Sequence, residues 1–173
     1  QWQWQANPKP YWAFTGNGRL RLFSYQEPDS ANNLWFVPNV LMQKFPAEAF
    51  TATVKLDFKP RLDGEKTGLL VMGADYAWIG LTKKADGIYL SYNLCKQADQ
   101  GKPETEQVIG KIDAATLYFR VQVQAGGQCR FSFSEDGSRF TEAGGPFIAH
   151  PGRWIGAKLG LFCTRTTRTN DSG

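Results

Sequence analysis

The segment between residues 131 and 144 constrains the fold of this chain more than any other. Phe131-Ser132-Phe133-Ser134 alternates apolar and polar residues, and alternate residues point to opposite faces of a β-strand. Asp136-Gly137 follows directly and is typical of a hairpin turn, because both residues tolerate left-handed backbone. Leu117-Tyr118-Phe119-Arg120-Val121-Gln122-Val123 alternates in the same way. The region therefore predicts an antiparallel meander with one face packed on a core, with Asp136 as a turn residue.

The rest of the chain repeats this pattern. Eighteen glycines and nine prolines separate short runs, and no stretch keeps the 3.6-residue apolar period of a helix. Predicted strands cover residues 19–25, 40–43, 50–58, 68–73, 78–82, 88–92, 107–112, 117–123, 131–134 and 154–163. Residues 60–67 and 97–106 are expected to be polar loops, and the tail from Thr164 shows no core pattern. About a dozen short strands predict an all-β sandwich or barrel. No composition shift divides residues 1–173, which indicates a single domain.

Charge and composition exclude several classes. The net charge of +4 comes from 20 basic and 16 acidic residues that are scattered along the chain, which argues against nucleic acid as a partner. No apolar run reaches about 18 residues, so no membrane span is expected. The chain begins with Gln1 rather than Met, which suggests a processed or excised piece and leaves localisation open. Cys95, Cys129 and Cys163 are odd in number and widely spaced, so a disulfide framework is not expected, and the strand-like runs around Cys129 and Cys163 favour buried positions for these two.

Catalytic chemistry finds little support in the sequence. The single histidine, His150, lies in a predicted loop without a nucleophile motif nearby. Glycoside hydrolysis needs two opposed carboxyl groups, and no convincing pair is present. Asp75 is the acid expected to be least exposed, and a turn residue that bonds its own backbone is the favoured interpretation. A lone histidine excludes multi-histidine metal sites, whereas a structural Ca²⁺ held by carboxylates and carbonyls stays possible, with no loop motif to mark it.

Aromatic residues are the other candidates for function. Six Trp and six Tyr could stack on sugar rings, although large aromatic side chains also dominate the cores of sandwiches. Trp12, Trp78 and Trp154 lie in strand-like surroundings, which favours core positions. Trp2, Trp4 and Trp35 lie near prolines and loops, and for them a sugar-binding role and a core position both stay open.

Seven segments, taken in order, resemble the concanavalin A-like domain that ends many family 43 glycoside hydrolases, the β-xylosidases and arabinofuranosidases. They are Trp2-Gln3-Trp4-Gln5 with Asn7-Pro8, the segment from Leu34-Trp35 to Leu41-Met42-Gln43-Lys44, Phe50 to Leu56, Gly68 to Ala77, Tyr118-Phe119-Arg120-Val121, the Ser-x-Asp-Gly hairpin at 134–137 with its flanking strands, and Trp154-Ile155-Gly156-Ala157-Lys158 with the apolar run to Phe162. Each segment alone is a weak signal. Their order across nearly the whole chain is specific.

The resemblance implies a jelly-roll β-sandwich of two antiparallel sheets that docks on a catalytic propeller, and the propeller carries the family's carboxylates. This chain would then be a non-catalytic accessory domain acting with a partner on xylan or arabinoxylan oligosaccharides, and no cofactor would be required. In the family's β-xylosidases a loop of this domain reaches the catalytic pocket, and Trp154 or Lys158 would be the equivalent residue here.

The resemblance also implies a departure from the family, since its members usually continue into a final strand rich in Asp, Phe and Trp. We expect that strand to be lacking here, and an edge to be exposed in consequence. Two alternatives stay open. One is an independent xylan-binding module that uses exposed Trp, and the other is a self-contained hydrolase, which would need two carboxyl groups facing each other across about 5–10 Å.

Overall fold

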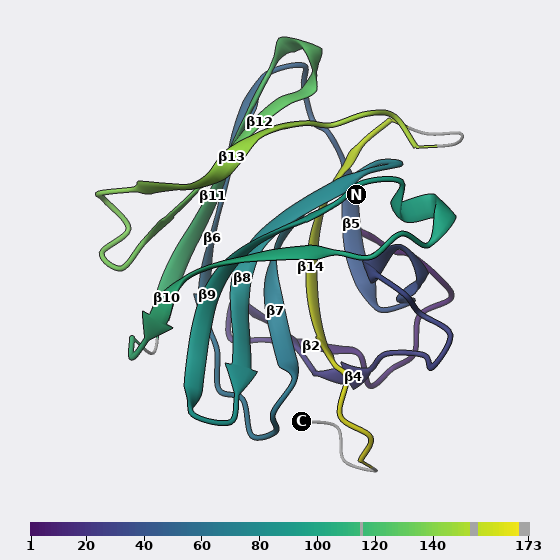
Figure 1. Ribbon diagram of the computed structural model, residues 1–173, viewed down its shortest axis with the longest axis vertical. Helices are drawn as coiled ribbons and strands as arrows, with labels where there is room; N and C mark the ends of the chain where they lie inside the picture. Colours follow the sequence, from purple (N-terminus) through teal and green to yellow (C-terminus); the bar gives the residue numbers. More distant parts are fainter. Residues whose placement is uncertain (115, 153–155, 170–173) are drawn as a thin grey trace.

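The computed structural model describes residues 1–114, 116–152 and 156–169, and within them the chain is built from β-strands and three short 3₁₀ helices, with no α-helix (Figure 1). The strands are β1 (Gln3–Trp4), β2 (Ala13–Gly16), β3 (Arg19–Leu22), β4 (Tyr25–Gln26), β5 (Val40–Lys44), β6 (Phe50–Asp57), β7 (Glu65–Met72), β8 (Tyr76–Lys84), β9 (Gly87–Cys95), β10 (Thr105–Ile112), β11 (Thr116–Gln124), β12 (Gln128–Ser134), β13 (Thr141–Ile148) and β14 (Lys158–Arg165). The 3₁₀ helices are η1 (Leu34–Phe36), η2 (Ala98–Gln100) and η3 (Ala125–Gly127). The predicted all-β class is confirmed.

The strands form two main antiparallel sheets and one separate hairpin. The larger sheet has the order β1-β5-β14-β7-β8-β9-β10, and β4 adds a short parallel pairing to β14. The smaller sheet has the order β13-β12-β11-β6, and β2 and β3 pair only with each other. The two-sheet sandwich predicted from the resemblance is therefore present. The expectation that a final strand is lacking stays a prediction.

The first core lies between the two sheets. The larger sheet contributes alternate residues of its central strands, and the smaller sheet contributes alternate residues of β11, β12 and β13. Fully buried members include Leu69, Val71, Ala77, Ile79 and Leu90 on one side and Leu117, Phe119, Val121, Phe131 and Phe147 on the other. Phe133 packs on the same core, so the alternation read at 131–134 is confirmed. Burial of each large side chain stabilises the fold by about 1.5–3 kcal/mol.

A second core covers the opposite face of the larger sheet. Leu70, Met72, Tyr76, Trp78 and Phe162 point away from the smaller sheet and pack against residues of η1 and η2. The indole of Trp78 meets the ring of Phe162 edge-on, with centroids 5.1 Å apart. Burial on both faces explains why the 68–72 run is continuously apolar rather than alternating. The sequence predicted one packed face for the meander, and it did not reveal this outer core.

Polar contacts hold η1 and η2 on the outer core. The Tyr76 hydroxyl accepts a hydrogen bond from the Leu34 amide (3.1 Å) and donates to Glu104 Oε2 (2.7 Å). The Trp78 indole N–H donates to the same carboxylate oxygen (2.8 Å). The Asn33 amide donates to the carbonyl oxygens of Ala98 (3.0 Å) and Lys102 (2.8 Å). Residues 97–106, expected to be only a polar loop, thus contain η2 and the start of β10.

Several strand boundaries differ from the predictions because buried polar residues were interpreted as loops. β7 begins at Glu65, within the predicted loop 60–67, and the Glu65 carboxylate is buried. It accepts hydrogen bonds from the Ser24 hydroxyl and from the backbone amides of Arg61 and Leu62. Thr164 and Arg165 are buried in β14, although the tail from Thr164 was expected to lack a core role.

The predicted strand 19–25 divides into β3 and β4, with Ser24 buried between them. The hairpin after Ser134 is also longer than a two-residue turn, because β13 begins only at Thr141. Asp136 Oδ1 accepts hydrogen bonds from the amides of Ser138 (2.8 Å) and Arg139 (2.9 Å). These bonds, Arg139 first, hold the pKa of the Asp136 carboxyl far below its usual value, and the turn role predicted for Asp136 is confirmed.

One end of the sandwich, called here the loop end, gathers the β5–β6 loop (45–49), the β7–β8 turn (73–75), η3 and the described parts of the β13–β14 loop (149–152 and 156–157). Two glycines without side chains allow that last loop to lie against the neighbouring backbone. A Cβ on Gly73 would lie 1.7 Å from the His150 carbonyl oxygen, and one on Gly127 would lie 2.6 Å from the Ala149 carbonyl oxygen. The Ala149 amide also donates to the Gly127 carbonyl (2.8 Å). The loop therefore passes directly over both glycines.

Among the described residues, no helix has the length and apolar character needed to cross a membrane.

Tyr76→Phe should destabilise the domain by about 1–3 kcal/mol, because it leaves the buried Leu34 amide without its acceptor and removes one donor from Glu104. Urea denaturation followed by fluorescence measures this change. Tyr89→Phe is the matched control, since its hydroxyl bonds Asp86 at the surface, and it should cost less than about 0.5 kcal/mol. Equal losses in the two variants would contradict a structural role for the Tyr76 network.

Gly73→Ala should cost about 1–3 kcal/mol, because the new methyl group forces the backbone at His150 to move. Gly145→Ala is the control, since a Cβ there meets no atom within 4 Å. Thermal or urea unfolding compares the two variants, and the control should stay within about 0.5 kcal/mol of the parent. An unchanged stability for Gly73→Ala would show that the loop does not need this close approach.

Candidate functional site

The three candidate tryptophans near the N-terminus occupy different surroundings. Trp2 is 41% exposed, whereas Trp4 is half-buried and meets the buried Trp12 edge-on, with centroids 5.3 Å apart. Trp35 lies in η1, packs on the outer core, and receives a hydrogen bond on its carbonyl oxygen from the Gln5 side chain. The contacts of Trp4 and Trp35 are thus those of packing, and Trp2 keeps the largest open ring surface of the three. The core positions predicted for Trp12 and Trp78 are confirmed.

Of the two pocket-completing candidates, Lys158 is among the described residues. Lys158 begins β14, half-buried, and pairs with Lys44 on one side and Met72 on the other. Two lysines opposite each other on neighbouring strands repel. Trp154 lies outside the described residues.

The loop end also carries a charged cluster that the sequence did not reveal. Asp75 Oδ1 accepts a hydrogen bond from the Gln97 amide (2.7 Å), and Oδ2 pairs with Lys96 Nζ (3.0 Å). Lys96 Nζ also lies 5.5 Å from the centre of the Phe147 ring. Burial raises the pKa of Asp75, but the bonds from Gln97 and Lys96 outweigh it and hold the pKa below its usual value. Asp75 is a turn residue as predicted, but its carboxylate bonds the next turn along the sheet and not its own backbone.

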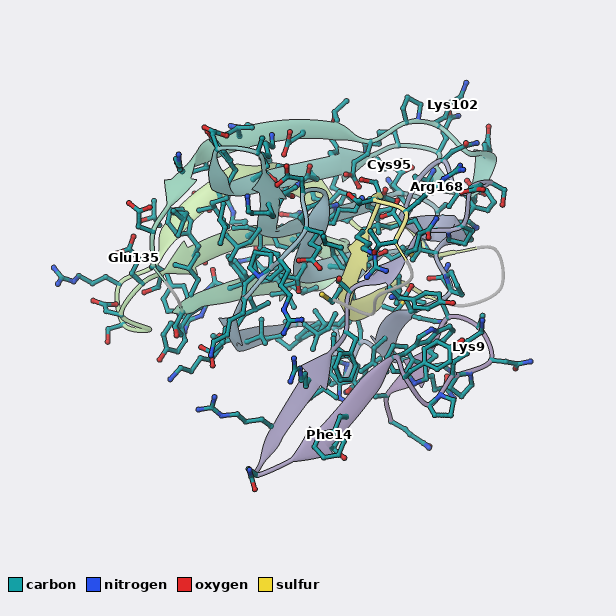
Figure 2. All side chains as sticks on the ribbon, turned by 90° about the horizontal axis from the view of Figure 1, so that it is seen from below. Lys9, Phe14, Cys95, Lys102, Glu135 and Arg168 are labelled. Atoms are coloured by element: carbon teal, nitrogen blue, oxygen red, sulfur yellow. The ribbon has the colours of Figure 1, made fainter. Side chains whose placement is uncertain are left out.

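Another missed feature is an aromatic cluster at the N-terminal segment. Tyr11 is 46% exposed, its ring lies 5.4 Å from that of Tyr25, and Lys9 Nζ lies within 6 Å of both ring centres. Contact with Tyr11 raises the pKa of Lys9, while the bond from Tyr25, followed by that from Lys9, lowers the pKa of Tyr11. Figure 2 places Lys9 on the N-terminal side of the molecule, well apart from the turn that carries Glu135. In the sequence, the feature that could have drawn attention to this cluster is the pair of prolines, Pro8 and Pro10, on either side of Lys9.

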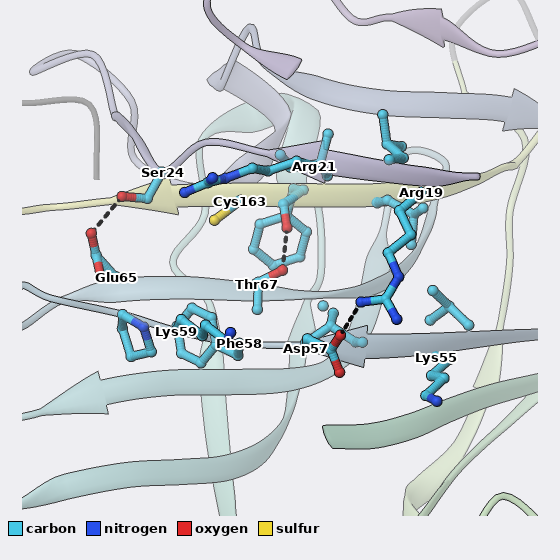
Figure 3. A pocket seen from close by; sticks show the side chains of 18 of the residues that line it. Arg19, Arg21, Ser24, Lys55, Asp57, Phe58, Lys59, Glu65, Thr67 and Cys163 are labelled. Carbon is cyan, nitrogen blue, oxygen red and sulfur yellow. Dashed lines mark hydrogen bonds and ion pairs between the residues drawn. The ribbon is translucent and has the colours of Figure 1, made fainter. Parts of the chain in front are cut away.

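A groove of about 770 Å³ lies between the smaller sheet and the β2–β3 hairpin (Figure 3). Strand β6 forms one wall and β3 the other, while β7 and β14 form the floor. Arg19 reaches across the groove to pair with Asp57 at 3.0 Å. No local pattern predicts this groove, because its walls and floor combine strands from residue 19 to residue 165 of the chain.

Two carboxylates line the groove, but neither has the surroundings of a catalytic acid. Asp57 accepts a hydrogen bond from Thr116 (2.6 Å), and this bond is the main cause that holds its pKa below the usual value. A general acid of a glycosidase needs a raised pKa instead. Glu65 is buried and accepts three hydrogen bonds from Ser24, Arg61 and Leu62. The described groove therefore offers no opposed acid pair for glycoside hydrolysis.

Cys95, Cys129 and Cys163 are all buried and free, and the buried positions predicted for Cys129 and Cys163 are confirmed. Burial raises the pKa of Cys129 to about 11 and that of Cys163 to about 12, so both stay protonated thiols near neutral pH. A nucleophilic cysteine needs the opposite shift. Within the described ranges no three side chains of His, Cys, Asp or Glu gather closely enough to hold a metal ion. The possible calcium ion stays a prediction.

Comparison with known proteins agrees with this architecture. The family model of the β-xylosidase C-terminal concanavalin A-like domain, of family 43, matches residues 1–173. A β-xylosidase from Formosa agariphila is 25% identical over 183 aligned positions, which cover 94% of this chain and 30% of that enzyme.

Solved structures show the same fold at lower identity. One is a family 43 glycoside hydrolase engineered at its active site to display both endo-xylanase and exo-arabinofuranosidase activity; it superposes with a TM-score of 0.81 at 20% identity, over 96% of this chain and 35% of that one. Another is the xylan β-1,4-xylosidase of Bacillus halodurans C-125, with a TM-score of 0.75 at 15% identity, over 95% of this chain and 33% of that one. The chain thus spans about a third of the enzymes that it matches. It belongs to the family of C-terminal concanavalin A-like domains of family 43 glycoside hydrolases.

Proposed function

We propose that this chain is a non-catalytic accessory domain that packs against the catalytic propeller of a family 43 glycoside hydrolase and helps to shape the pocket of that enzyme for xylan-derived sugars. The main observation in support is that the whole chain matches a domain found in β-xylosidases while it spans only about a third of the length of such enzymes. The remaining length of those enzymes is sufficient for a separate catalytic domain.

The surroundings of the carboxylates support a role without catalysis. Asp57, Asp75 and Asp136 all have lowered pKa values, and each is held by hydrogen bonds or ion pairs to neighbouring residues. Such groups are ionised near neutral pH and have no proton to give to a leaving group. The groups that catalyse glycoside hydrolysis in the pocket would therefore come from the partner domain.

The loop end supports a role in completing a pocket. Ala149 and His150 lie close over Gly127 and Gly73, and the Asp75–Lys96 pair joins two neighbouring turns there. A closely packed segment loses little conformational entropy when it contacts a partner. Lys158, with Lys44 opposite, presents positive charge that suits the hydroxyl groups of a sugar or a carboxylate of the partner.

Association with the catalytic propeller is the direct test. This chain, mixed with the catalytic domain of a family 43 β-xylosidase produced separately, should elute from gel filtration as one complex, because the two domains would share an interface. Two independent peaks at concentrations of about 100 μM, well above the dissociation constants of stable domain pairs, would contradict the proposal.

Within a joined enzyme, Lys158→Ala and Trp154→Ala should each lower kcat/KM for xylo-oligosaccharides about tenfold, a loss that matches one contact in the transition state. Arg139→Ala is the control, because Arg139 is exposed in the β12–β13 turn at the opposite end of β12. It should leave kcat/KM unchanged. If Arg139→Ala lowered kcat/KM as much as Lys158→Ala and Trp154→Ala, this result would argue against a pocket at the loop end.

An independent xylan-binding module is the second candidate, favoured by the open ring of Trp2 and by the Lys9–Tyr11–Tyr25 cluster. Titration calorimetry of the isolated chain with xylan and arabinoxylan oligosaccharides separates the two functions. Under the accessory-domain proposal no heat of binding is expected. Saturable heat that disappears in Trp2→Ala or Tyr11→Ala but persists in Phe36→Ala, another exposed aromatic position, would favour the binding module instead.

A further inference from the structure

Strand β10 ends the strand order of the larger sheet, next to β9 (Figure 1). Its ladder partner is β9, and within the described part of the chain no other element forms a backbone hydrogen bond with residues 105–112. In an antiparallel ladder alternate N–H and C=O groups point to each side of a strand. The groups of β10 that point away from β9 are therefore free to pair with an added strand.

The smaller sheet does not cover β10. Its edge strand β13 packs over β9, where the backbone of Gly144 lies against the ring of Tyr92 and leaves no room for a side chain. β10 lies one strand further out, and residues 105–109 are all exposed. Near the middle of the strand, Val108 is 46% exposed and Ile109 is 37% exposed. Two apolar side chains thus lie open at the centre of a free edge.

A bulge in β10 places two opposite charges on one face of the strand. Glu106 lies opposite Asn93 and Lys111 lies opposite Tyr89, and the register shifts between them, at residues 108–110. Asn93 and Tyr89 are four residues apart in β9 and share a face, which is turned away from the smaller sheet because the alternate residues of β9 pack on the first core. Glu106 and Lys111 are five residues apart, so they reach the same face only through the extra residue of the bulge.

Both charges already have a partner in their own chain and can take a second one. Glu106 pairs with Lys84 at 2.9 Å, and Lys111 pairs with Asp86 at 3.5 Å. All four side chains are at least 37% exposed. A carboxylate accepts several hydrogen bonds and an ammonium group donates three, so these pairs leave bonding capacity unused.

Two copies of β10 are complementary when they pair antiparallel about a two-fold axis between Val108 and Ile109. In this register Glu106 of each copy lies opposite Lys111 of the other, on the same face of the joined sheet. Opposite charges that face each other across neighbouring strands stabilise the pairing. The exposed Val108 and Ile109 of both copies would meet at the axis and bury their apolar surface.

We propose that this chain forms a symmetric dimer in which the β10 strands of two copies pair edge to edge and join the two larger sheets into one. A two-fold interface uses the same surface of both copies, so that surface must be complementary to itself. The β10 edge meets this condition through its central apolar pair and the Glu106 and Lys111 on either side. The inference uses only β10 and its neighbours, and it does not depend on the proposed enzyme context.

The joined sheet leaves room for the smaller sheets. Both would lie on the same side, separated by the two β10 strands, with about 14 Å between the two β9 strands that they cover. The edge of β13 is less suited to such pairing. Pro146 has no N–H to donate, and the only charged residue of β13 is Glu142, which pairs with Arg130 of its own sheet.

Sedimentation equilibrium of the whole chain, from about 10 μM to about 1 mM, tests the proposal. It should show a reversible equilibrium between monomer and dimer in this range, since an interface of one strand pair is small. Hydrogen exchange followed by mass spectrometry should show that residues 105–112 become protected as the fraction of dimer rises.

Exchange of the charges locates the interface. Glu106→Lys places cations of the two copies opposite each other and should weaken the dimer at least about tenfold, and Lys111→Glu should do the same with anions. An equimolar mixture of the two variants should dimerise about as tightly as the parent chain, because each cation then faces an anion of the other copy. A loss of stability caused by either substitution would not be reversed by mixing.

Glu48→Lys is the matched control. It makes the same change of charge in the exposed β5–β6 loop, and β5 is far from β10 in the strand order of the larger sheet. It should leave the dissociation constant of the dimer within about twofold of the parent value, and it should not rescue Lys111→Glu in a mixture. Circular dichroism confirms that each variant stays folded.

Four results would overturn the proposal. The first is a chain that stays monomeric at about 1 mM. The second is a dimer whose protected residues lie outside 105–112. The others are equal weakening by Glu106→Lys and the control, and a mixture of the two β10 variants that associates no more tightly than either variant alone.

Discussion

Burial of both faces of the larger sheet is the constraint on which the other features depend. Its central strands pack inward on the smaller sheet and outward on η1 and η2, so most residues of β7 and β8 are buried. Polar groups that enter this interior need partners, because an unpaired buried donor or acceptor costs about 1–3 kcal/mol. Tyr76, Trp78 and Glu104 satisfy one another for this reason, and so do Ser24 and Glu65.

The same packing explains where function can reside. The candidate sites described above lie at the surface: the loop end, the aromatic cluster at Lys9, and the groove beside β6. The loop end is fixed by glycines that allow backbone to cross backbone, whereas the groove exists because the smaller sheet has fewer strands than the larger one. At the groove and the loop end, hydrogen bonds hold the pKa values of Asp57 and Asp75 below the usual value.

Much of the fold could be predicted from the sequence, and the errors have physical causes. Alternation at 50–57 and 131–134 identified strands that bury one face, because that pattern reports exposure directly. Boundaries failed where buried residues are polar, as at Glu65 and Arg165, whose hydrogen-bond partners lie far along the chain. The tryptophans were candidates by type alone, and composition does not reveal which ring faces solvent. Trp12 and Trp78 are buried, whereas Trp2 is open.

The sequence by itself determined the all-β class, the positions of most strands, the buried positions of Cys129 and Cys163 and the resemblance to the family, since these depend on local alternation and on motif order. Only the tertiary structure decided which strands are neighbours. The outer core, the Asp75–Lys96 pair and the groove between β6 and β3 all join residues that are distant in sequence. Strand order is set by long-range packing, which a local pattern does not encode.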